Sequence, residues 1–324
     1  MTMEYTQISN TDLKPSAICL GIGSIGVKNT EAEGMALLDA FVEQGGTFID
    51  TAHVYSNWAP GETSRSERIL GDWMATRKNR DHLVIGTKGG HPDLSTMLIS
   101  RLCRADLEED VNGSLKKLQT DTIDLYYLHR DDPSLPVSDI LDTLHDFQTV
   151  GKIRFYACSN WTPARIREAN TYAHEKGYTG FVANQMRWNI GCFHMRPSSD
   201  QTMCGMDRET LTYHKQTGLA AIPYSSQAGG FFSKRNDHPE AVVHSGYNTE
   251  ANQTLHVYLQ SLTQTLGLTM SQIILAYFWS HSFTAIPIVG CRNRTQLDDS
   301  LLAVWCRLPD EVMVRIDHLN GLSH

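Results

Sequence analysis

The sequence predicts an α/β fold, a (β/α)8 barrel with long loops on one face, and three observations lead to this class. Eight short apolar runs alternate with helix-length segments, which is typical of a parallel sheet surrounded by helices. Polar residues directly follow several runs, as expected where strand ends gather on one face of a barrel. The count of eight such runs favours a closed barrel over an open, doubly wound sheet. We expect a single domain over residues 1–324.

The expected strands are short apolar runs, most of them rich in β-branched or aromatic residues. In chain order they cover residues 18–22, 47–50, 83–87, 123–128, 153–157, 181–184, 219–223 and 285–289. All eight are short enough to be buried strands, because helices need longer periodic segments.

The segments between these runs carry helix signals. In EGMALLDAFVEQG, Met35, Leu38 and Val42 recur at helical spacing, and a glycine pair ends the helix. Further along, Thr162 fits the N-cap of a helix that has Pro163 at its first position. Each signal falls between two expected strands, as the barrel requires.

Two strand-to-helix connections are long, one over residues 186–207 and one over residues 225–248. Connections of more than about 15 residues are usually functional lids or disordered segments. Both follow the carboxyl ends of strands, so we favour a lid or cofactor clamp on the catalytic face. The closing stretch 308–321, LPDEVMVRIDHLNG, predicts a last helix packed outside the barrel.

Composition narrows the partners and the compartment. A net charge of -8 without a basic stripe argues against nucleic-acid binding. No apolar run reaches the roughly 18 residues that span a bilayer, and the N-terminus has no signal-like core. Seven cysteines without a C-x-x-C pair predict reduced thiols. We therefore expect a soluble, cytoplasmic protein with a small-molecule partner and no membrane. We expect no metal, since Cys192, His194 and Cys204 lack zinc-like spacing.

Four polar residues, Asp50, Tyr55, Lys88 and His129, lie at or just past the ends of three successive expected strands. They suit one kind of chemistry. A tyrosine phenol has an ordinary pKa of about 10 and is a weak acid unless a nearby cation stabilises its phenolate. Lys88 supplies such a cation, Asp50 can hold Lys88, and His129 can orient a carbonyl oxygen. The set predicts protonation of a carbonyl while another group delivers hydride.

Simpler interpretations of the same residues stay open. A strand-end carboxylate such as Asp50 often caps a turn. A structural salt bridge between Lys88 and Asp50 would leave the same sequence pattern as a catalytic pair. Outside this context His129 would be a satisfied core histidine, and its neighbours in HRDD are interpreted as solvated charges.

The chain resembles the aldo-keto reductases over almost its whole length. The segments DTAHVY, GTKGG and LYYLHRDD are similar to the motifs that carry the family's catalytic tetrad, in the same order. The resemblance implies a (β/α)8 barrel and a tetrad of Asp50, Tyr55, Lys88 and His129. It also implies hydride transfer between a nicotinamide and a carbonyl carbon, in either direction, with Tyr55 as the acid or base.

The same resemblance implies a set of cofactor ligands. They are Ser159, Asn160, Gln185, Tyr224, Ser225, Gln227, Gly229, Gly290, Arg292, Gln296 and Ser300. Tyr224 would stack on the nicotinamide, and loop capping remains the alternative for the residues after the fifth and sixth strands. Arg292 offers a planar fork for a ribose 2′-phosphate, so NADP(H) is preferred and NAD(H) is possible.

Three departures from the family pattern bear on this assignment. Ser300 stands where an asparagine usually contacts adenine, and a hydroxyl cannot make both amide bonds. Ser226-Gln227 replaces the usual Pro-Leu after Ser225, so the pyrophosphate loop can run differently. Arg187-Trp188 replaces the acidic-aromatic pair common after Gln185, so the resemblance does not define the substrate-side wall.

Five loop residues are expected to face the substrate, namely Trp58, His91, Trp161, Arg187 and Trp188. Flat aromatic faces among hydrogen-bonding side chains favour a sugar or another polyhydroxylated carbonyl compound over a steroid or a long-chain aldehyde. The alternative is that one or two of the tryptophans only pack the loops. The oligomeric state is not written in the sequence.

Two other functions are kept beside the reductase. Some proteins of this fold that resemble the chain are regulatory subunits of potassium channels, which bind cofactor and turn over slowly. A barrel hydrolase with a metal at the strand ends is the other, but it needs paired histidines and carboxylates that the tetrad lacks.

Overall fold

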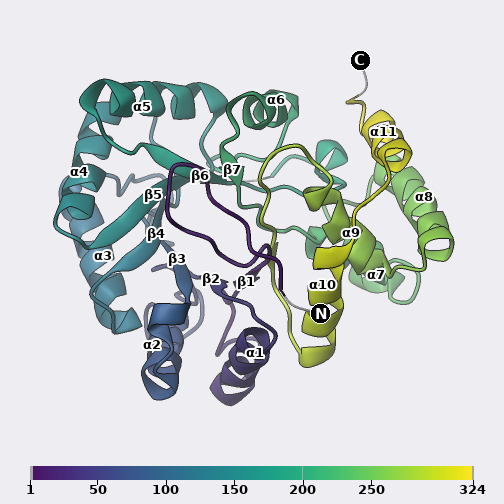
Figure 1. Ribbon diagram of the computed structural model, residues 1–324, viewed down its shortest axis with the longest axis horizontal. Helices are drawn as coiled ribbons and strands as arrows, with labels where there is room; N and C mark the ends of the chain where they lie inside the picture. Colours follow the sequence, from purple (N-terminus) through teal and green to yellow (C-terminus); the bar gives the residue numbers. More distant parts are fainter. Residues whose placement is uncertain (1–2, 199, 323–324) are drawn as a thin grey trace.

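Eight parallel strands form the centre of the molecule in the computed structural model, which describes residues 3–198 and 200–322 (Figure 1). The strands are β1 (Cys19–Gly21), β2 (Phe48–Asp50), β3 (Val84–Gly89), β4 (Ile123–Leu128), β5 (Ile153–Ser159), β6 (Phe181–Gln185), β7 (Ala220–Ala221) and β8 (Ile288–Val289). All eight overlap the ranges expected from the apolar runs, so the predicted order of strands is confirmed.

The sheet closes on itself. Its strand order is β7-β6-β5-β4-β3-β2-β1-β8. Between its two ends, Ala221 pairs in parallel with Ala285, and the Ile286 N–H donates to the Ala221 carbonyl at 2.9 Å. This junction completes a barrel, and the predicted (β/α)8 fold is confirmed.

Helices surround the barrel in Figure 1. They are α1 (Glu31–Glu43), α2 (Arg65–Arg77), α3 (Arg104–Leu118), α4 (Val137–Thr149), α5 (Pro163–Lys176), α6 (Arg208–Thr217), α7 (Phe231–Lys234), α8 (Glu250–Leu266), α9 (Met270–Trp279), α10 (Arg294–Leu302) and α11 (Asp310–Leu319). The last of them lies beside α8 outside the barrel, as predicted (Figure 1). In the described part of the chain, none of these helices combines the length and the apolarity that a bilayer crossing requires.

The predicted helix signals act at the predicted places. The Thr162 hydroxyl accepts from the Arg165 N–H and caps α5, with Pro163 at its first position. In α1 the helix ends before the glycine pair, but the buried face is centred on Leu38 and Phe41, whereas Met35 and Val42 are only partly buried. The face is therefore rotated slightly from the one that the spacing suggested.

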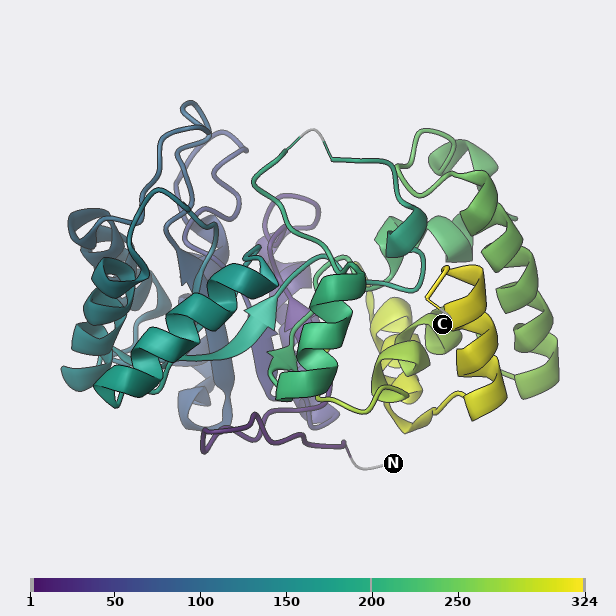
Figure 2. The same ribbon diagram turned by 90° about the horizontal axis from the view of Figure 1, so that it is seen from above.

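Two separate apolar layers form around the strands. One fills the barrel, with Phe48, Leu125 and Tyr127 pointing inward, and the other lies between the strands and the helices. The N-terminal segment crosses one end of the barrel, where Ile8 and Leu13 belong to the interior layer (Figure 2). That end is plugged, so the opposite end is left for a site.

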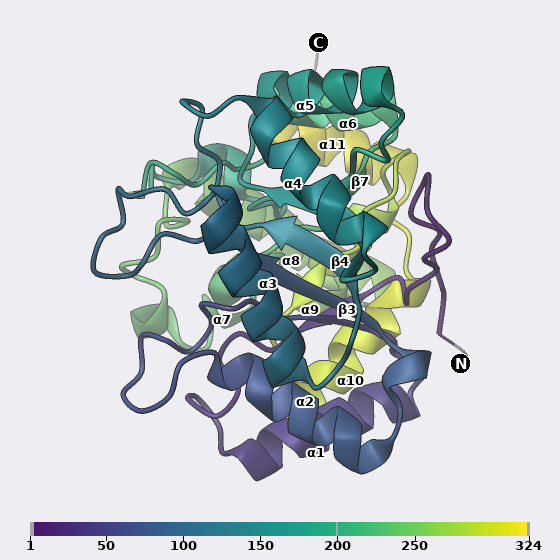
Figure 3. The ribbon, with the colours of Figure 1, turned by 90° about the vertical axis from the view of Figure 1, so that its left-hand side faces the viewer.

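The loops that follow the strands gather at this opposite end (Figures 2 and 3). In its described parts, residues 186–198 and 200–207, the first long connection contains only the short helix η2 (Cys192–His194). The connection after β7 contains η3 (Ala228–Gly230), α7 and η4 (Pro239–Ala241), so it is partly helical. Both long connections therefore lie on the face where the strand-end residues converge.

Candidate active site

A buried ion pair lies at the centre of the barrel mouth. The Lys88 ammonium, completely buried near the end of β3, donates to Asp50 Oδ1 at 2.8 Å and Oδ2 at 2.7 Å. It also donates to the Thr51 carbonyl at 2.6 Å, so three acceptors fix its position. Burial alone would lower the pKa of Lys88, but the negative charges of Asp50 and of an ionised Tyr55 raise it above the ordinary value. Lys88 is therefore held as a cation.

Tyr55 lies directly against this cation. The Lys88 Nζ is 4.6 Å from the centre of the Tyr55 ring. Burial raises the pKa of the Tyr55 phenol, and Lys88 lowers it without cancelling that increase. Lys88 thus favours the phenolate, as expected. Burial has the larger effect on the pKa, however, and keeps the Tyr55 phenol protonated.

His129 forms the next side of the group. Its ring is 5.6 Å from the Tyr55 ring and 4.8 Å from the His91 ring, edge-on to both. Burial, followed by the positive charge of Lys88, holds the pKa of His129 well below its usual value. Its Nδ1 has no hydrogen-bond partner among the described residues. The imidazole is therefore neutral, and the four predicted tetrad residues lie together.

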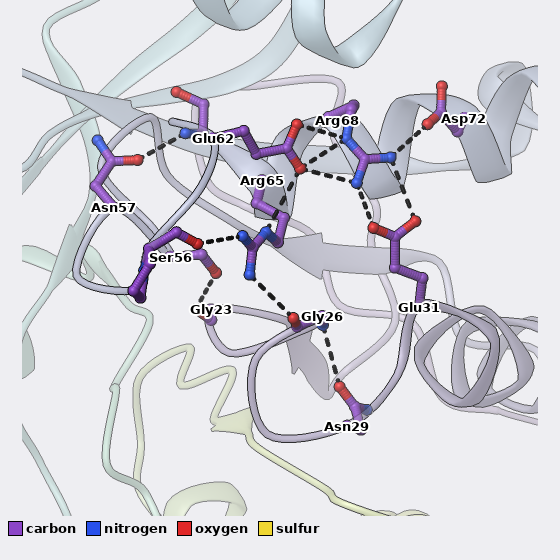
Figure 4. A network of polar contacts seen from close by, with 12 residues as sticks. Gly23, Gly26, Asn29, Glu31, Ser56, Asn57, Glu62, Arg65, Arg68 and Asp72 are labelled. Atoms are coloured by element: carbon purple, nitrogen blue, oxygen red, sulfur yellow. Dashed lines mark hydrogen bonds and ion pairs between the residues drawn. The ribbon is translucent and has the colours of Figure 1, made fainter.

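A network on the outside of the mouth holds the loop that carries Tyr55 (Figure 4). Arg65 donates to the carbonyls of Gly26 at 3.2 Å and Pro60 at 2.8 Å, which joins the loops after β1 and β2. Gly23 lies against the Tyr55 ring, where an added Cβ would be 3.1 Å from two ring carbons. The glycine thus permits a close approach that fixes the phenol.

Arg68 completes this network from α2 (Figure 4). It pairs with Glu62 at 2.8 Å and Asp72 at 2.8 Å, and also with Glu31 at the start of α1. The first turns of α1 and α2 are thereby tied to the loop beside the mouth.

The predicted nicotinamide ligands lie on the other side of the tetrad. The Asn160 amide donates to the His129 carbonyl at 3.1 Å and to Ser159 Oγ at 3.1 Å, and Tyr224 donates to Asn160 Oδ1 at 2.8 Å. Asn160 adopts φ of 63°, a left-handed backbone that turns its amide back over the strand ends. The Gln185 side-chain amide donates a hydrogen bond to Asp50 Oδ1 at 2.8 Å. These residues form one group around the tetrad.

The remaining predicted cofactor residues lie at the ends of β7 and β8. Ser225 is exposed, and Gln227 donates to Ser271 Oγ at 2.6 Å. Added Cβ atoms at Gly229 and Gly290 would meet no atom within 4 Å, so a ligand can approach the backbone at both. These open backbones suit a phosphate-bearing cofactor.

Of the three predicted cofactor residues that follow Gly290, Arg292 and Gln296 are exposed, whereas Ser300 is buried. The Arg292 N–H donates to Gln296 Oε1 at 2.9 Å, and the exposed Arg292 side chain makes no ion pair in the described part of the chain. Ser300 is buried, and its hydroxyl donates to the Gln296 carbonyl at 2.8 Å within α10. Arg292 is therefore free for a phosphate, whereas Ser300 already uses its donor.

Three of the five predicted substrate residues are at the mouth. Trp58 is 52 % exposed and lies edge-on to the Tyr55 ring at 6.2 Å. His91 is next to His129, and half-buried Arg187 lies over the Tyr224 ring at 6.0 Å.

Trp161 and Trp188 are not at the mouth, which corrects the prediction for both. Trp161 is buried against Phe181, and its indole N–H donates to the Arg130 carbonyl at 3.1 Å. Trp188 is completely buried and packs edge-on to Phe278 of α9 at 4.9 Å. Neither indole presents a face to a substrate.

The interpretation of HRDD as solvated charges is also wrong for two residues. Arg130 is buried and donates to Thr202 Oγ1 at 2.9 Å and to Asp200 at 3.2 Å, which ties the connection 186–207 to the mouth. Asp131 pairs with Arg165 at 3.4 Å, and burial raises its pKa to about 6 although Arg165 opposes the shift. Since these partners are far away in sequence, no local pattern indicated them.

The sequence matches the Aldo/keto reductase family over residues 17–321. The chain belongs to this family. The family acts on small carbonyl compounds with a nicotinamide cofactor, so the protein is an NAD(P)H-dependent oxidoreductase. Within the described residues, no group of three or more His, Cys, Asp or Glu side chains is arranged to hold a metal ion.

Similar proteins come from fungi and bacteria. The norsolorinic acid reductase stcV of Emericella nidulans is 31% identical over 94% of this chain and 78% of its own length. The putative aryl-alcohol dehydrogenase AAD14 of Saccharomyces cerevisiae is 28% identical over 93% of this chain and 79% of its own. Among solved structures, the thermostable aldo-keto reductase Tm1743 in complex with epalrestat has a TM-score of 0.74 at 22% identity, covering 98% of this chain and 100% of its own. At this level of sequence identity, the similarity to Tm1743 shows a shared fold alone.

Proposed function

We propose that this aldo-keto reductase reduces an aldehyde or ketone with NADP(H), and runs the reverse oxidation, with Tyr55 as the acid or base. The observation that carries the proposal is the position of the Lys88 ammonium, held on both Asp50 oxygens and 4.6 Å from the Tyr55 ring. Few structural needs explain a completely buried lysine beside a phenol, because burying a charge is costly.

Each residue of the tetrad has a separate role in this proposal. Tyr55 donates its phenolic proton to the carbonyl oxygen, and Lys88 stabilises the phenolate that remains. Asp50 keeps Lys88 in position. The neutral His129 imidazole donates a hydrogen bond from its one ring N–H to the carbonyl oxygen, and it does not have to become an imidazolium to do so. The cofactor, when bound, supplies the hydride.

The cofactor would lie between Tyr224 and the loop after β8. The Asn160 and Ser159 side chains suit the carboxamide, and the flat Tyr224 ring suits the nicotinamide. The open backbones at Gly229 and Gly290 would admit the phosphates. The Arg292 guanidinium, which has no ion-pair partner among the described residues, supports a preference for NADP(H) over NAD(H), because arginine binds phosphate with two parallel hydrogen bonds.

The substrate proposed here has a flat apolar part. With Trp161 and Trp188 in the core, the predicted sugar site retains Trp58 as its only exposed tryptophan among the three. The loop after β3 adds exposed Leu98 and Ile99. These apolar side chains favour an aromatic carbonyl compound, and one similar protein is named a putative aryl-alcohol dehydrogenase. That the substrate is a sugar remains a prediction, which the same assay can test.

The experiment is a steady-state assay of the purified protein with NADPH and a panel of aromatic aldehydes, ketones and aldoses. The rate is measured as the consumption of NADPH. Fluorescence quenching measures cofactor binding separately. Turnover that depends on Tyr55 supports the proposal. Tight cofactor binding without turnover in either direction would instead favour the regulatory-subunit alternative.

We also propose a single domain over residues 1–324 and a cytoplasmic location. All seven cysteines are free, which supports a reducing compartment.

A further inference from the structure

Arg187 points into the barrel mouth although it lies beyond the end of β6. Its backbone pairs in parallel with Tyr224, and the Tyr224 N–H donates to the Met186 carbonyl at 3.0 Å, so the extended pairing continues past Gln185. Side chains alternate along an extended strand. Met186 and Trp188 are buried in the layer beneath the helices. Arg187 therefore points the same way as Gln185, toward the tetrad.

The guanidinium of Arg187 has unusually weak partners. Its two terminal nitrogens donate to Met195 Sδ at 3.5 Å and Met203 Sδ at 3.4 Å, and it lies over the Tyr224 ring. A thioether sulfur is a weak acceptor. Among residues 3–198 and 200–322, no carboxylate is within ion-pair distance of this side chain.

Two buried arginines beside the mouth, Arg130 and Arg165, differ in this respect. Arg130 pairs with Asp200 at 3.2 Å, and Arg165 pairs with Asp131 at 3.4 Å. The fold thus supplies a carboxylate for each of these buried guanidinium groups. A half-buried cation without an anion is costly to keep, so Arg187 fits a site whose anion comes with a ligand.

We propose that Arg187 binds a carboxylate of the substrate, so that the preferred substrate is an oxo acid, with its carbonyl toward Tyr55 and its carboxylate toward the connection 186–207. This inference rests on the proposed reductase function and makes its substrate class narrower. A planar guanidinium matches a carboxylate with two parallel hydrogen bonds, and the thioethers of Met195 and Met203 leave those donors available without competing strongly. The adjacent Tyr224 ring provides a flat wall for the body of the substrate.

A phosphate of the cofactor is the competing source of negative charge. The proposed phosphate arginine, Arg292, follows β8, whereas Arg187 follows β6, and β7 lies between these strands in the closed barrel. The two arginines therefore occupy different parts of the mouth. Separate measurements on substrate and cofactor distinguish the two sources.

The test compares 4-carboxybenzaldehyde with its neutral methyl ester, which keeps the same aldehyde and ring. The ratio of kcat/KM for acid over ester is measured in the wild type, in Arg187→Met and in Arg187→Lys. We expect the wild type to prefer the acid and the ratio to fall by about 10- to 100-fold in Arg187→Met, as for a lost charged hydrogen bond. Arg187→Lys should keep part of the preference.

Arg167→Met is the matched control. Arg167 is also an arginine over a tyrosine ring, 5.4 Å from the centre of Tyr213, but it is exposed on the outer surface of α5. Arg167→Met changes the net charge by the same amount as Arg187→Met but leaves the mouth intact. The acid-to-ester ratio of kcat/KM in Arg167→Met should therefore equal that of the wild type. An equal fall in both variants would overturn the proposal, because it would reflect overall charge.

A measurement on the wild type alone covers the case in which Arg187→Met does not fold. Benzoate should inhibit reduction of the neutral ester more strongly than benzamide, by about 10-fold or more. Equal inhibition would overturn the proposal, as would a loss of NADPH affinity in Arg187→Met that exceeds its loss of acid preference. If neither aldehyde is reduced, the reductase proposal itself fails. If both are reduced at a ratio that Arg187 does not affect, only the carboxylate site fails.

Discussion

Gln185 donates a 2.8 Å hydrogen bond to Asp50 Oδ1, the same oxygen that accepts from Lys88. The two residues are 135 positions apart, on β6 and β2, so the bond crosses the barrel mouth. Burial raises the pKa of Asp50, and the Lys88 ammonium and the Gln185 amide oppose that shift. The amide that was predicted to bind nicotinamide thus also supports the ion pair beside Tyr55.

The first prediction concerns the proton donor. Tyr55→Phe should lower kcat by about 10²–10⁴-fold, because it removes the proposed general acid and keeps the ring on Lys88. The affinity for NADPH, measured by fluorescence quenching, should change little. Tyr5→Phe removes an exposed phenol that donates to the Gly45 carbonyl and serves as the control. A Tyr55→Phe protein with most of its kcat would exclude Tyr55 as the acid.

The second prediction concerns the pH dependence. Reduction requires protonated Tyr55, so the rate falls as pH rises through the pKa of its phenol. Lys88 lowers that pKa and Asp50 raises it. Lys88→Met should therefore move the alkaline limb of the pH-rate profile to higher pH, with a large fall in kcat. The profile is measured for reduction of a good aldehyde.

Two further variants make this experiment decisive. Removing Lys88 alone leaves a buried carboxylate unpaired, which can cost about 3–5 kcal/mol of stability. The double variant Asp50→Asn, Lys88→Met avoids that charge. Lys176→Met, which removes an ammonium 5.5 Å from the Tyr172 ring on α5, is the control. A wild-type profile in the Lys88 variants would mean that Lys88 has only a structural role.

The third prediction concerns cofactor choice. Arg292→Ala should weaken NADPH by about one to two decades and NADH much less, since a charged hydrogen bond to phosphate is worth about 1.5–3 kcal/mol. Arg294→Ala is the control, because Arg294 is already paired with Asp298 at 2.7 Å. Equal losses for the two cofactors, or a wild-type preference for NADH, would contradict the assignment.

The sequence was sufficient to predict the strands and the proximity of the four tetrad residues, because both depend on local patterns. A buried strand is written as a short apolar run, and Asp50, Lys88 and His129 each stand at the end of one. In a parallel barrel such ends must converge, so residues from β2, β3 and β4 could be brought together without a structure.

The misassigned residues depend on contacts across the fold. Trp188 looked like a loop residue, but the pairing of Arg187 with Tyr224 extends the strand pattern, and alternation turns Trp188 toward α9. Trp161 is buried by Phe181 of β6. Arg130 is removed from solvent by Asp200, 70 residues away. Local sequence shows none of these partners.

The fourth prediction concerns the class of substrate. Across aromatic aldehydes, bulky ketones and aldoses, kcat/KM should be highest for aromatic aldehydes, because exposed Trp58 beside Tyr55 and exposed Leu98 and Ile99 in the loop after β3 are apolar. Trp58→Ala should reduce the advantage of aromatic over short aliphatic aldehydes. If an aldose exceeds every aromatic aldehyde, the original sugar prediction is right and the aromatic proposal is wrong.

The last prediction concerns the position of the phenol. Gly23→Ala would place a methyl group 3.1 Å from two carbons of the Tyr55 ring, so the ring must move by a few tenths of an ångström. Because a displacement of about 1 Å can cost 10²-fold in rate, we expect kcat to fall by about tenfold while NADPH affinity stays near that of the wild type. Gly246→Ala is the control, since its added methyl would be 3.5 Å from Met195, an ordinary contact. Unchanged kcat in Gly23→Ala would show that the chemistry tolerates this shift of Tyr55 and that the close approach of Gly23 serves packing alone.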